Sequence, residues 1–169
     1  MEITLEFKNE LEEIYQSLFN DNRVRRMLEI PMHRGSNCFL HSFKVAKKAI
    51  HRALNKKSID LKVLLYGAIL HDYYLYDWRK DKSKRKSHGR SHPIIAADQA
   101  KKDFDIPDEA ASIIRSHMWP LNFKLYPKNK EAKLLSFSDK SIAIKEFFSS
   151  SKRKQKNREK EMKYISTLF

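Results

Sequence analysis

Apolar residues recur at intervals of three and four along most of the chain, the spacing that predicts amphipathic helices. Between residues 7 and 19, for example, Phe7, Leu11, Ile14 and Leu18 fall on one face. The residues Asn20, Asp21 and Asn22 break this first pattern. We expect helices over residues 3–19, 39–54, 58–76, 93–103, 106–118, 131–149 and 158–168, with a short helical piece between Val24 and Ile30.

One stretch, residues 66–74, is apolar on nearly every side and ends abruptly in His71 and Asp72. A segment that is apolar all round is a buried segment, so we expect it in the middle of the domain. A His and an Asp at its end are then buried polar groups that need partners. A His-Asp pair arises easily by chance, so it matters only where other residues complete a site.

The periodicity also predicts which side of each helix is buried. In the second helix an apolar stripe runs from Phe39 to Ile50, and His41 falls beside it. Pro93 is expected in the first turn of its helix, where its missing N–H is tolerated. In the helix over 131–149 we expect Asp139 to lie among seven inward-packing apolar residues: Leu134, Leu135, Phe137, Ile142, Ile144, Phe147 and Phe148.

Composition indicates which fold class and which cellular compartment we expect for the protein. The chain has 169 residues, which is the length of one domain, and it has only 3 Gly, 5 Pro and few alternating β-branched runs. We therefore expect an all-α bundle of about six to seven helices that forms a single domain over residues 1–169. With one cysteine, Cys38, and no signal-peptide pattern, we expect a cytoplasmic protein without an intramolecular disulfide. No window reaches about 18 apolar residues, so we expect no membrane span.

The formal charge of +14 adds a preference for anionic partners. The excess is concentrated in two runs: residues 79–90 have seven basic residues and one acid, and residues 151–163 have seven and two. Each run can be a solvated face. No aromatic residue interleaves either run, so neither carries the stacking platform of a single-strand binder. Nucleic acid stays a possible partner, but the charge does not require it.

Each of five consecutive expected helices offers a metal-ligand type of side chain toward the interior. A single buried His is usually a satisfied core residue, but the same feature in five helices together indicates a built site. A mixture of imidazole and carboxylate suits Fe, Mn, Zn, Ni or Co better than it suits a Cys-rich structural zinc site. Six ligands exceed what one catalytic ion uses, so we expect two divalent ions with Asp72 between them. The six candidates are His41, His71, Asp72, His92, His117 and Asp139.

The order of these residues resembles the HD-domain superfamily of metal-dependent phosphohydrolases, whose pattern is H…HD…D on a helical bundle. The resemblance covers residues 38–148 and extends to three neighbourhoods: His41 with Val45 four residues on, the apolar junction before His71-Asp72, and Asp139 followed by Lys140. The two additional histidines, His92 and His117, are similar to those of the members with binuclear centres. The residues 73–76 lack the acids that follow HD in guanosine tetraphosphate hydrolases and in 5′-deoxynucleotidases.

The resemblance implies hydrolysis of a phosphate ester in a small, nucleotide-like or otherwise phosphorylated substrate by metal-activated water. It implies that His41, His71, Asp72 and Asp139 hold a first ion, and that His92 and His117 hold a second ion with Asp72 shared. Arg34 and Lys140 are our candidates for binding the phosphate, and His33, His51 and His88 are held in reserve. Two alternatives stay open at this point: a di-iron oxygenase on the same scaffold, and a basic RNA- or polyanion-binding module without catalysis. The sequence does not indicate an oligomeric state.

Overall fold

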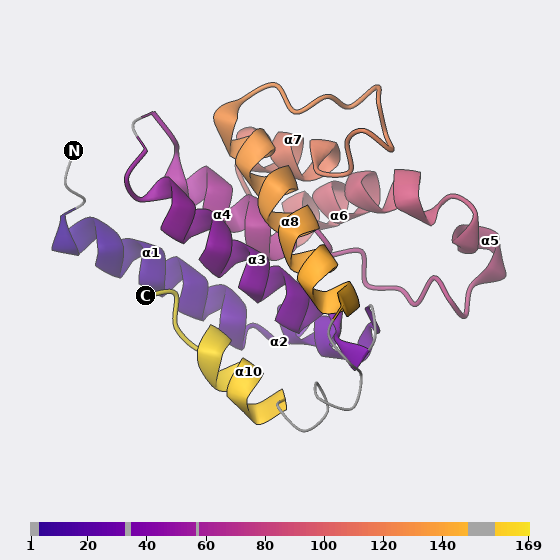
Figure 1. Cartoon of the computed structure of the whole chain (residues 1–169), viewed down its shortest axis with the longest axis horizontal. Helices are drawn as coiled ribbons and strands as arrows, with labels where there is room; N and C mark the ends of the chain where they lie inside the picture. Colours follow the sequence, from indigo (N-terminus) through magenta and orange to yellow (C-terminus); the bar gives the residue numbers. More distant parts are fainter. Residues whose placement is uncertain (1–3, 33–34, 57, 149–157) are drawn as a thin grey trace.

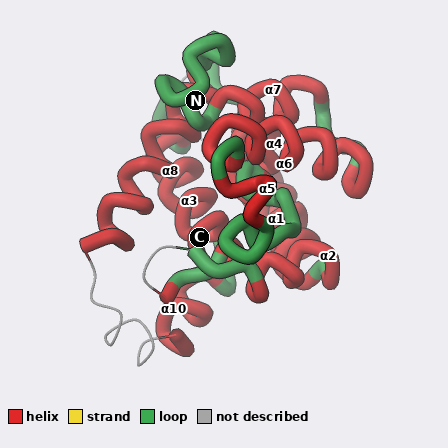
Figure 2. Tube along the Cα trace, turned by 90° about the vertical axis from the view of Figure 1, so that its right-hand side faces the viewer, coloured by secondary structure: helices red, strands yellow, loops and turns green. Residues whose placement is uncertain are grey.

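The computed structural model of the chain describes residues 4–32, 35–56, 58–148 and 158–169. These residues form helices and loops and contain no β-strand, so the all-α prediction is confirmed for the part of the chain described (Figures 1 and 2). The helices are α1 (Leu5–Asn20), α2 (Asn22–Arg25), the 3-10 helix η1 (Arg26–Glu29), α3 (Cys38–Ala53), α4 (Leu61–Leu70), α5 (Lys82–Arg85), α6 (His88–Phe104), α7 (Asp108–Ser116), α8 (Lys130–Phe148) and α10 (Arg158–Ile165).

Helix α3 lies in the middle of the bundle, where it packs against α4 and α8 (Figure 1). Helix α4 in turn packs against α7, and α7 packs against α6. On the other side, α1 and α10 close the core. The Tyr15 hydroxyl of α1 donates a 2.7 Å hydrogen bond to the carbonyl of Ile165 in α10. The Tyr15 ring also meets Phe43 of α3 edge-on, with centroids 5.1 Å apart, so one aromatic side chain joins three helices.

The central helices α3 and α4 begin at side-chain caps. The Asn37 side chain accepts a 2.9 Å hydrogen bond from the Leu40 amide at the start of α3. The Asp60 carboxylate accepts from the amides of Lys62 and Val63 at the start of α4. Each cap satisfies backbone donors that the first helical turn leaves without a partner.

Helix α4 is the buried helix that the sequence predicts, but it is shorter than expected. It approaches α7 so closely that a Cβ at Gly67 would lie 2.6 Å from Ile113 Cγ1. The prediction that the helix continues to Tyr76 is wrong, because it ends at Leu70. The His71 side chain donates to the Ala68 carbonyl, and Leu75 adopts a positive φ of 47°, which a helix does not permit. The chain therefore turns at His71-Asp72.

Two further expectations between residues 79 and 104 are corrected. The run 79–90 is partly helical, because the short α5 lies inside it. Helix α6 begins at His88, so Pro93 lies inside the helix and not in its first turn. The early start is supported by ring packing, since His88 stacks on Trp78 with centroids 5.0 Å apart. The second basic run lies partly outside the described residues, and its described part, 158–163, belongs to α10.

The expected packing of α8 is wrong for four of its apolar residues. Leu134 and Leu135 are buried as predicted, and Ile142 is half-buried. In contrast, four side chains expected in the core are 50–79% exposed: Phe137, Ile144, Phe147 and Phe148. The inward side of α8 instead carries Ser138, Asp139 and Glu146, because this side of the helix faces a polar site. No helix among the described residues has the length and apolar character to cross a membrane.

Candidate metal centre

The structure brings the six predicted ligands together from five helices. Two of them lie within helices α3 and α6, one lies in α8, and the other three follow directly after the ends of α4 and α7. All six side chains are buried. They form three overlapping groups whose ligand atoms lie within 4.8 Å of one another: His41, His71 and Asp72; His71, His117 and Asp139; Asp72, His92 and His117. Each group is suited to hold a metal ion.

Hydrogen bonds to backbone carbonyls fix the same tautomer in three of the four histidines. Nδ1 of His71 donates to the Ala68 carbonyl at 2.9 Å, Nδ1 of His92 to the His88 carbonyl at 2.8 Å, and Nδ1 of His117 to the Ile114 carbonyl at 2.7 Å. A carbonyl oxygen can only accept, so the proton of these rings belongs on Nδ1. The local cause is helical: each ring folds back on the carbonyl three or four residues earlier.

The remaining ring nitrogens point into one small volume. Nε2 of His92 and Nε2 of His117 are 3.1 Å apart, and the protons on Nδ1 leave each with a lone pair. Nε2 of His71 is fully buried and makes no hydrogen bond. Two lone pairs facing each other and a buried acceptor without a donor are costly unless a cation sits between them. The donor set therefore fits a divalent metal ion on its own chemistry.

The two carboxylates are placed to serve different parts of this volume. Asp72 turns one oxygen toward His71 at 3.4 Å and the other toward His92 at 3.4 Å. The second oxygen also lies 4.0 Å from His117 Nε2. Asp139 lies 3.0 Å from His41 Nε2 and 3.7 Å from His71 Nε2. Asp72 thus faces both halves of the cluster, as a bridging ligand would.

The electrostatics of the cluster favour a positive charge. Burial alone would raise the pKa of Asp72 and of Asp139, but the surrounding histidines hold both pKa values well below their usual range. Burial opposes charge on His41, yet its hydrogen bonds to Asp139 and Glu146 raise its pKa to about 10. Burial, together with the neighbouring His71 and His92, lowers the pKa of His117 to about 3. Ionised carboxylates beside a neutral imidazole form an environment for a cation.

Glu146 is a functional residue that the sequence analysis missed. Its Oε2 accepts a 2.9 Å hydrogen bond from His41 Nδ1, while Oε1 accepts from Ser36 Oγ at 3.1 Å and from Lys44 Nζ at 3.2 Å. A carboxylate in this place holds the His41 ring in position and directs its Nε2 toward Asp139. The spacing could have indicated it, because Glu146 follows Asp139 by seven residues and so lies two turns along the same side of α8.

A cavity of about 630 Å³ opens from the cluster. Lys140 lines it, and its ammonium donates to the His117 carbonyl at 3.1 Å and to Ser136 Oγ. Burial lowers the pKa of Lys140. Arg34, the other predicted phosphate ligand, lies outside the described residues, whereas Arg79 lines the cavity and was not predicted. Lys140 therefore stands where a substrate could be bound, and its contact with substrate stays a prediction.

The three histidines held in reserve are not among the clustered ligands. His88 forms part of the cavity wall, where it stacks on His92 with centroids 4.6 Å apart. Burial and the neighbouring His92 lower the pKa of His88 to about 4. His51 lies near the C-terminal end of α3, where it is exposed and hydrogen-bonds to the Leu168 carbonyl. His33 lies outside the described residues.

The HD domain family model matches residues 38–144, a span that contains all six clustered ligands. The match covers more than half of the chain. The protein belongs to the HD domain family. No curated protein and no solved structure shows significant similarity to the chain. HD domains bind divalent metals and are generally metal-dependent hydrolases, so membership supports the chemistry that the buried His/Asp cluster of this chain suggests.

Proposed function

We propose that this HD domain protein is a metal-dependent phosphohydrolase with a binuclear centre. The observation that carries the proposal is the convergence of four Nε2 atoms and two carboxylates in a buried volume, with every Nδ1 already engaged. One ion would be held by His41, His71, Asp72 and Asp139. A second would be held by His92 and His117, with Asp72 shared between the two.

A bound divalent cation supplies a Lewis acid that polarises a phosphoryl group and lowers the pKa of water. The residues of the chain supply the geometry. Asp72 reaches both halves of the centre and can accept the proton of an attacking water. Glu146 and the helix carbonyls keep the imidazoles from turning, which preserves the direction of each lone pair. The charge of Lys140 lies beside the cavity and would offset the charge of a phosphate.

The walls of the cavity favour a phosphorylated substrate that also carries a planar group. Trp78 and Tyr74 line the cavity, and Arg79 places its guanidinium 4.6 Å from the Trp78 ring centroid. The Trp78 ring stacks on His88, which in turn stacks on His92. Planar side chains thus lead from the cavity wall to the candidate ligands. A nucleotide-like substrate would place its base along this wall and its phosphate at the cluster.

The deciding experiment combines metal analysis with a phosphate-release screen of nucleotides, phosphodiesters and sugar phosphates. Protein expressed in metal-supplemented medium should carry close to two ions per chain. Asp72→Asn should reduce turnover by on the order of a thousand-fold, because it removes the shared carboxylate. Asp98→Asn is the matched control, since it removes the same charge from an exposed residue of α6 that pairs with Arg115. Circular dichroism checks that both variants keep the helical fold.

Three outcomes would contradict the proposal. The first is metal-free protein after supplementation, and the second is full activity in Asp72→Asn. The third is turnover that requires oxygen, which would place the same cluster in an oxygenase. Phosphate release under anaerobic conditions is therefore part of the screen.

A further inference from the structure

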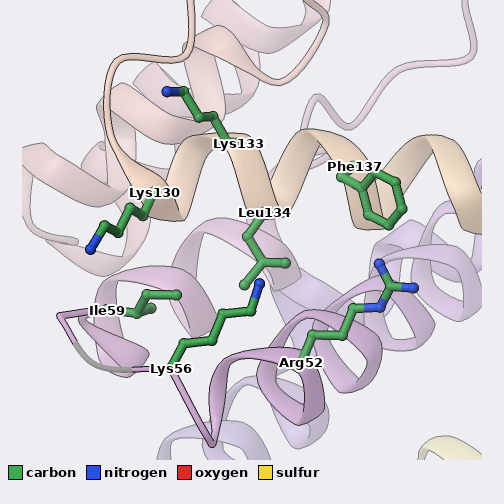
Figure 3. A pocket seen from close by; sticks show the side chains of 7 residues that line it. All are labelled: Arg52, Lys56, Ile59, Lys130, Lys133, Leu134 and Phe137. Atoms are coloured by element: carbon green, nitrogen blue, oxygen red, sulfur yellow. The ribbon is translucent and has the colours of Figure 1, made fainter.

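A second hollow, away from the metal centre, is lined by basic side chains. It has a volume of about 600 Å³ and lies between the end of α3, the loop before α4 and the start of α8 (Figure 3). None of its lining residues contributes to the cavity at the metal centre. We call it the basic groove; it is lined by Arg52, Lys56, Ile59, Lys130, Lys133, Leu134 and Phe137.

The cations of the basic groove are not neutralised by the protein. Among the residues that the structure describes, none of its four basic side chains forms an ion pair with a carboxylate. Some cations elsewhere are paired, as Arg115 is with Asp98. The neighbouring acid Glu131 is 8% exposed and accepts a hydrogen bond from the Asp60 amide, so it does not face the groove as a free charge. The groove therefore presents net positive charge to solvent.

The positive field continues along α3 and α8. Lys48 donates to Ser141, one turn along α8 from Phe137. The pKa of Lys48 is lowered, first by burial and then by the neighbouring cations Lys145 and Arg52. The line of cations is thus longer than the groove itself, and it follows the seam between the two helices.

An aromatic ring lies among these cations. Phe137 is 55% exposed, and the Arg52 guanidinium lies 4.5 Å from its centroid. Neither basic run of the sequence has an interleaved aromatic, whereas the fold creates this combination from two separate helices. Exposed aromatic rings beside cations are what single-strand binding surfaces use to stack bases while neutralising phosphates.

The arrangement points to an extended anion. In Figure 3 Lys56 and Arg52 extend toward Leu134 and Phe137, whereas Lys130 and Lys133 extend away from them, so the four charged ends do not converge on one point. A single phosphate needs convergent donors, and a membrane surface needs a convex apolar face. We propose that the basic groove binds single-stranded nucleic acid, with backbone phosphates on its four cations and a base stacked on Phe137.

The test uses the full chain and a fluorescent U12 oligonucleotide, with inorganic polyphosphate as an anion without bases. If all four cations contact phosphates, affinity for U12 should fall about 50-fold between 50 and 200 mM salt. Lys130→Gln with Lys133→Gln should reduce that dependence to about 7-fold. The control, Lys8→Gln with Lys102→Gln, makes the same change of net charge on α1 and α6 and should leave the salt dependence of the wild type.

Phe137→Ala separates base stacking from simple charge attraction. It should weaken binding of U12 by about 5- to 150-fold and leave polyphosphate binding unchanged. Equal binding of U12 by the wild type and Phe137→Ala would overturn the proposal in favour of a site for anions in general. Loss of salt dependence in the Lys8/Lys102 control equal to that in the Lys130/Lys133 variant would also overturn it, as would binding to anionic lipid vesicles without binding to U12.

Discussion

Glu146→Gln tests the geometry of the candidate metal centre at a residue that is not one of the six candidate ligands. The substitution keeps the shape of a side chain that is 4% exposed but removes its charge. His41 Nδ1 then loses an ionised acceptor at 2.9 Å, and Lys44 loses one of its two carboxylate partners. With a weaker acceptor behind it, the His41 ring is a poorer and less fixed ligand.

The expected loss is 10- to 100-fold in metal affinity, which corresponds to about 1.4 to 2.8 kcal/mol. We expect the upper part of this range for two reasons. The Glu146 side chain is buried, so water does not screen its interaction with His41. His41 also differs from the other three imidazoles. A carboxylate accepts the hydrogen bond from its Nδ1, whereas in the other three a backbone carbonyl three or four residues earlier accepts it.

Competition between the metal-free protein and a chromophoric chelator for Zn²⁺ measures the affinity directly. Glu161→Gln is the matched control, because Glu161 holds the same Lys44 ammonium at 3.0 Å. The control should bind Zn²⁺ as the wild type does. If Glu146→Gln keeps wild-type affinity, Glu146 does not orient His41. If both variants lose affinity equally, Glu146 acts only through Lys44.

Two other predictions follow from the buried parts of the structure. Adding Zn²⁺ at about 100 times its Kd should stabilise the fold by about 2.7 kcal/mol and raise the unfolding temperature by roughly 5–10 °C, and His71→Ala should abolish this rise in calorimetry because it removes a central ligand. Gly67→Ala should destabilise the protein by about 1–3 kcal/mol in urea unfolding, because the new methyl group would meet the Ile113 side chain. The cost should shrink in an Ile113→Val background, and an unchanged cost would show that the contact between α4 and α7 is not the cause.

The sequence predicted that the candidate ligands would lie on interior sides of the bundle, because the signal for the buried side of a helix is local. His41 and Asp139 each occupy a helical position whose neighbours fix which way it faces, and His71 follows directly after α4. The structure brings all three together. The apolar run before His71 predicted a buried helix, and α4 is buried along almost its whole length. The roles of these residues as metal ligands stay a prediction that the Zn²⁺ and turnover measurements test.

Contacts between distant segments could not be predicted in the same way. The bond between Glu146 and His41 joins residues 105 positions apart, and it exists only because α3 and α8 pack side by side. The basic groove has the same origin, since Arg52 and Phe137 belong to different helices. The end of α4 depends on a side-chain bond from His71 to Ala68, which competes with continuation of the helix and leaves no mark in the periodicity.

In helix α8 the apolar periodicity predicted the wrong buried side, because the inward side of this helix faces the candidate site. Apolar residues were assigned to the inward side, yet that side carries Ser138, Asp139 and Glu146, which face the metal centre. A polar site occupies the inner side of the helix, so less of that side is left for apolar packing. Phe137 and Ile144 lie on the outer side. In the proposed mode of binding, a base would cover the Phe137 ring in the basic groove.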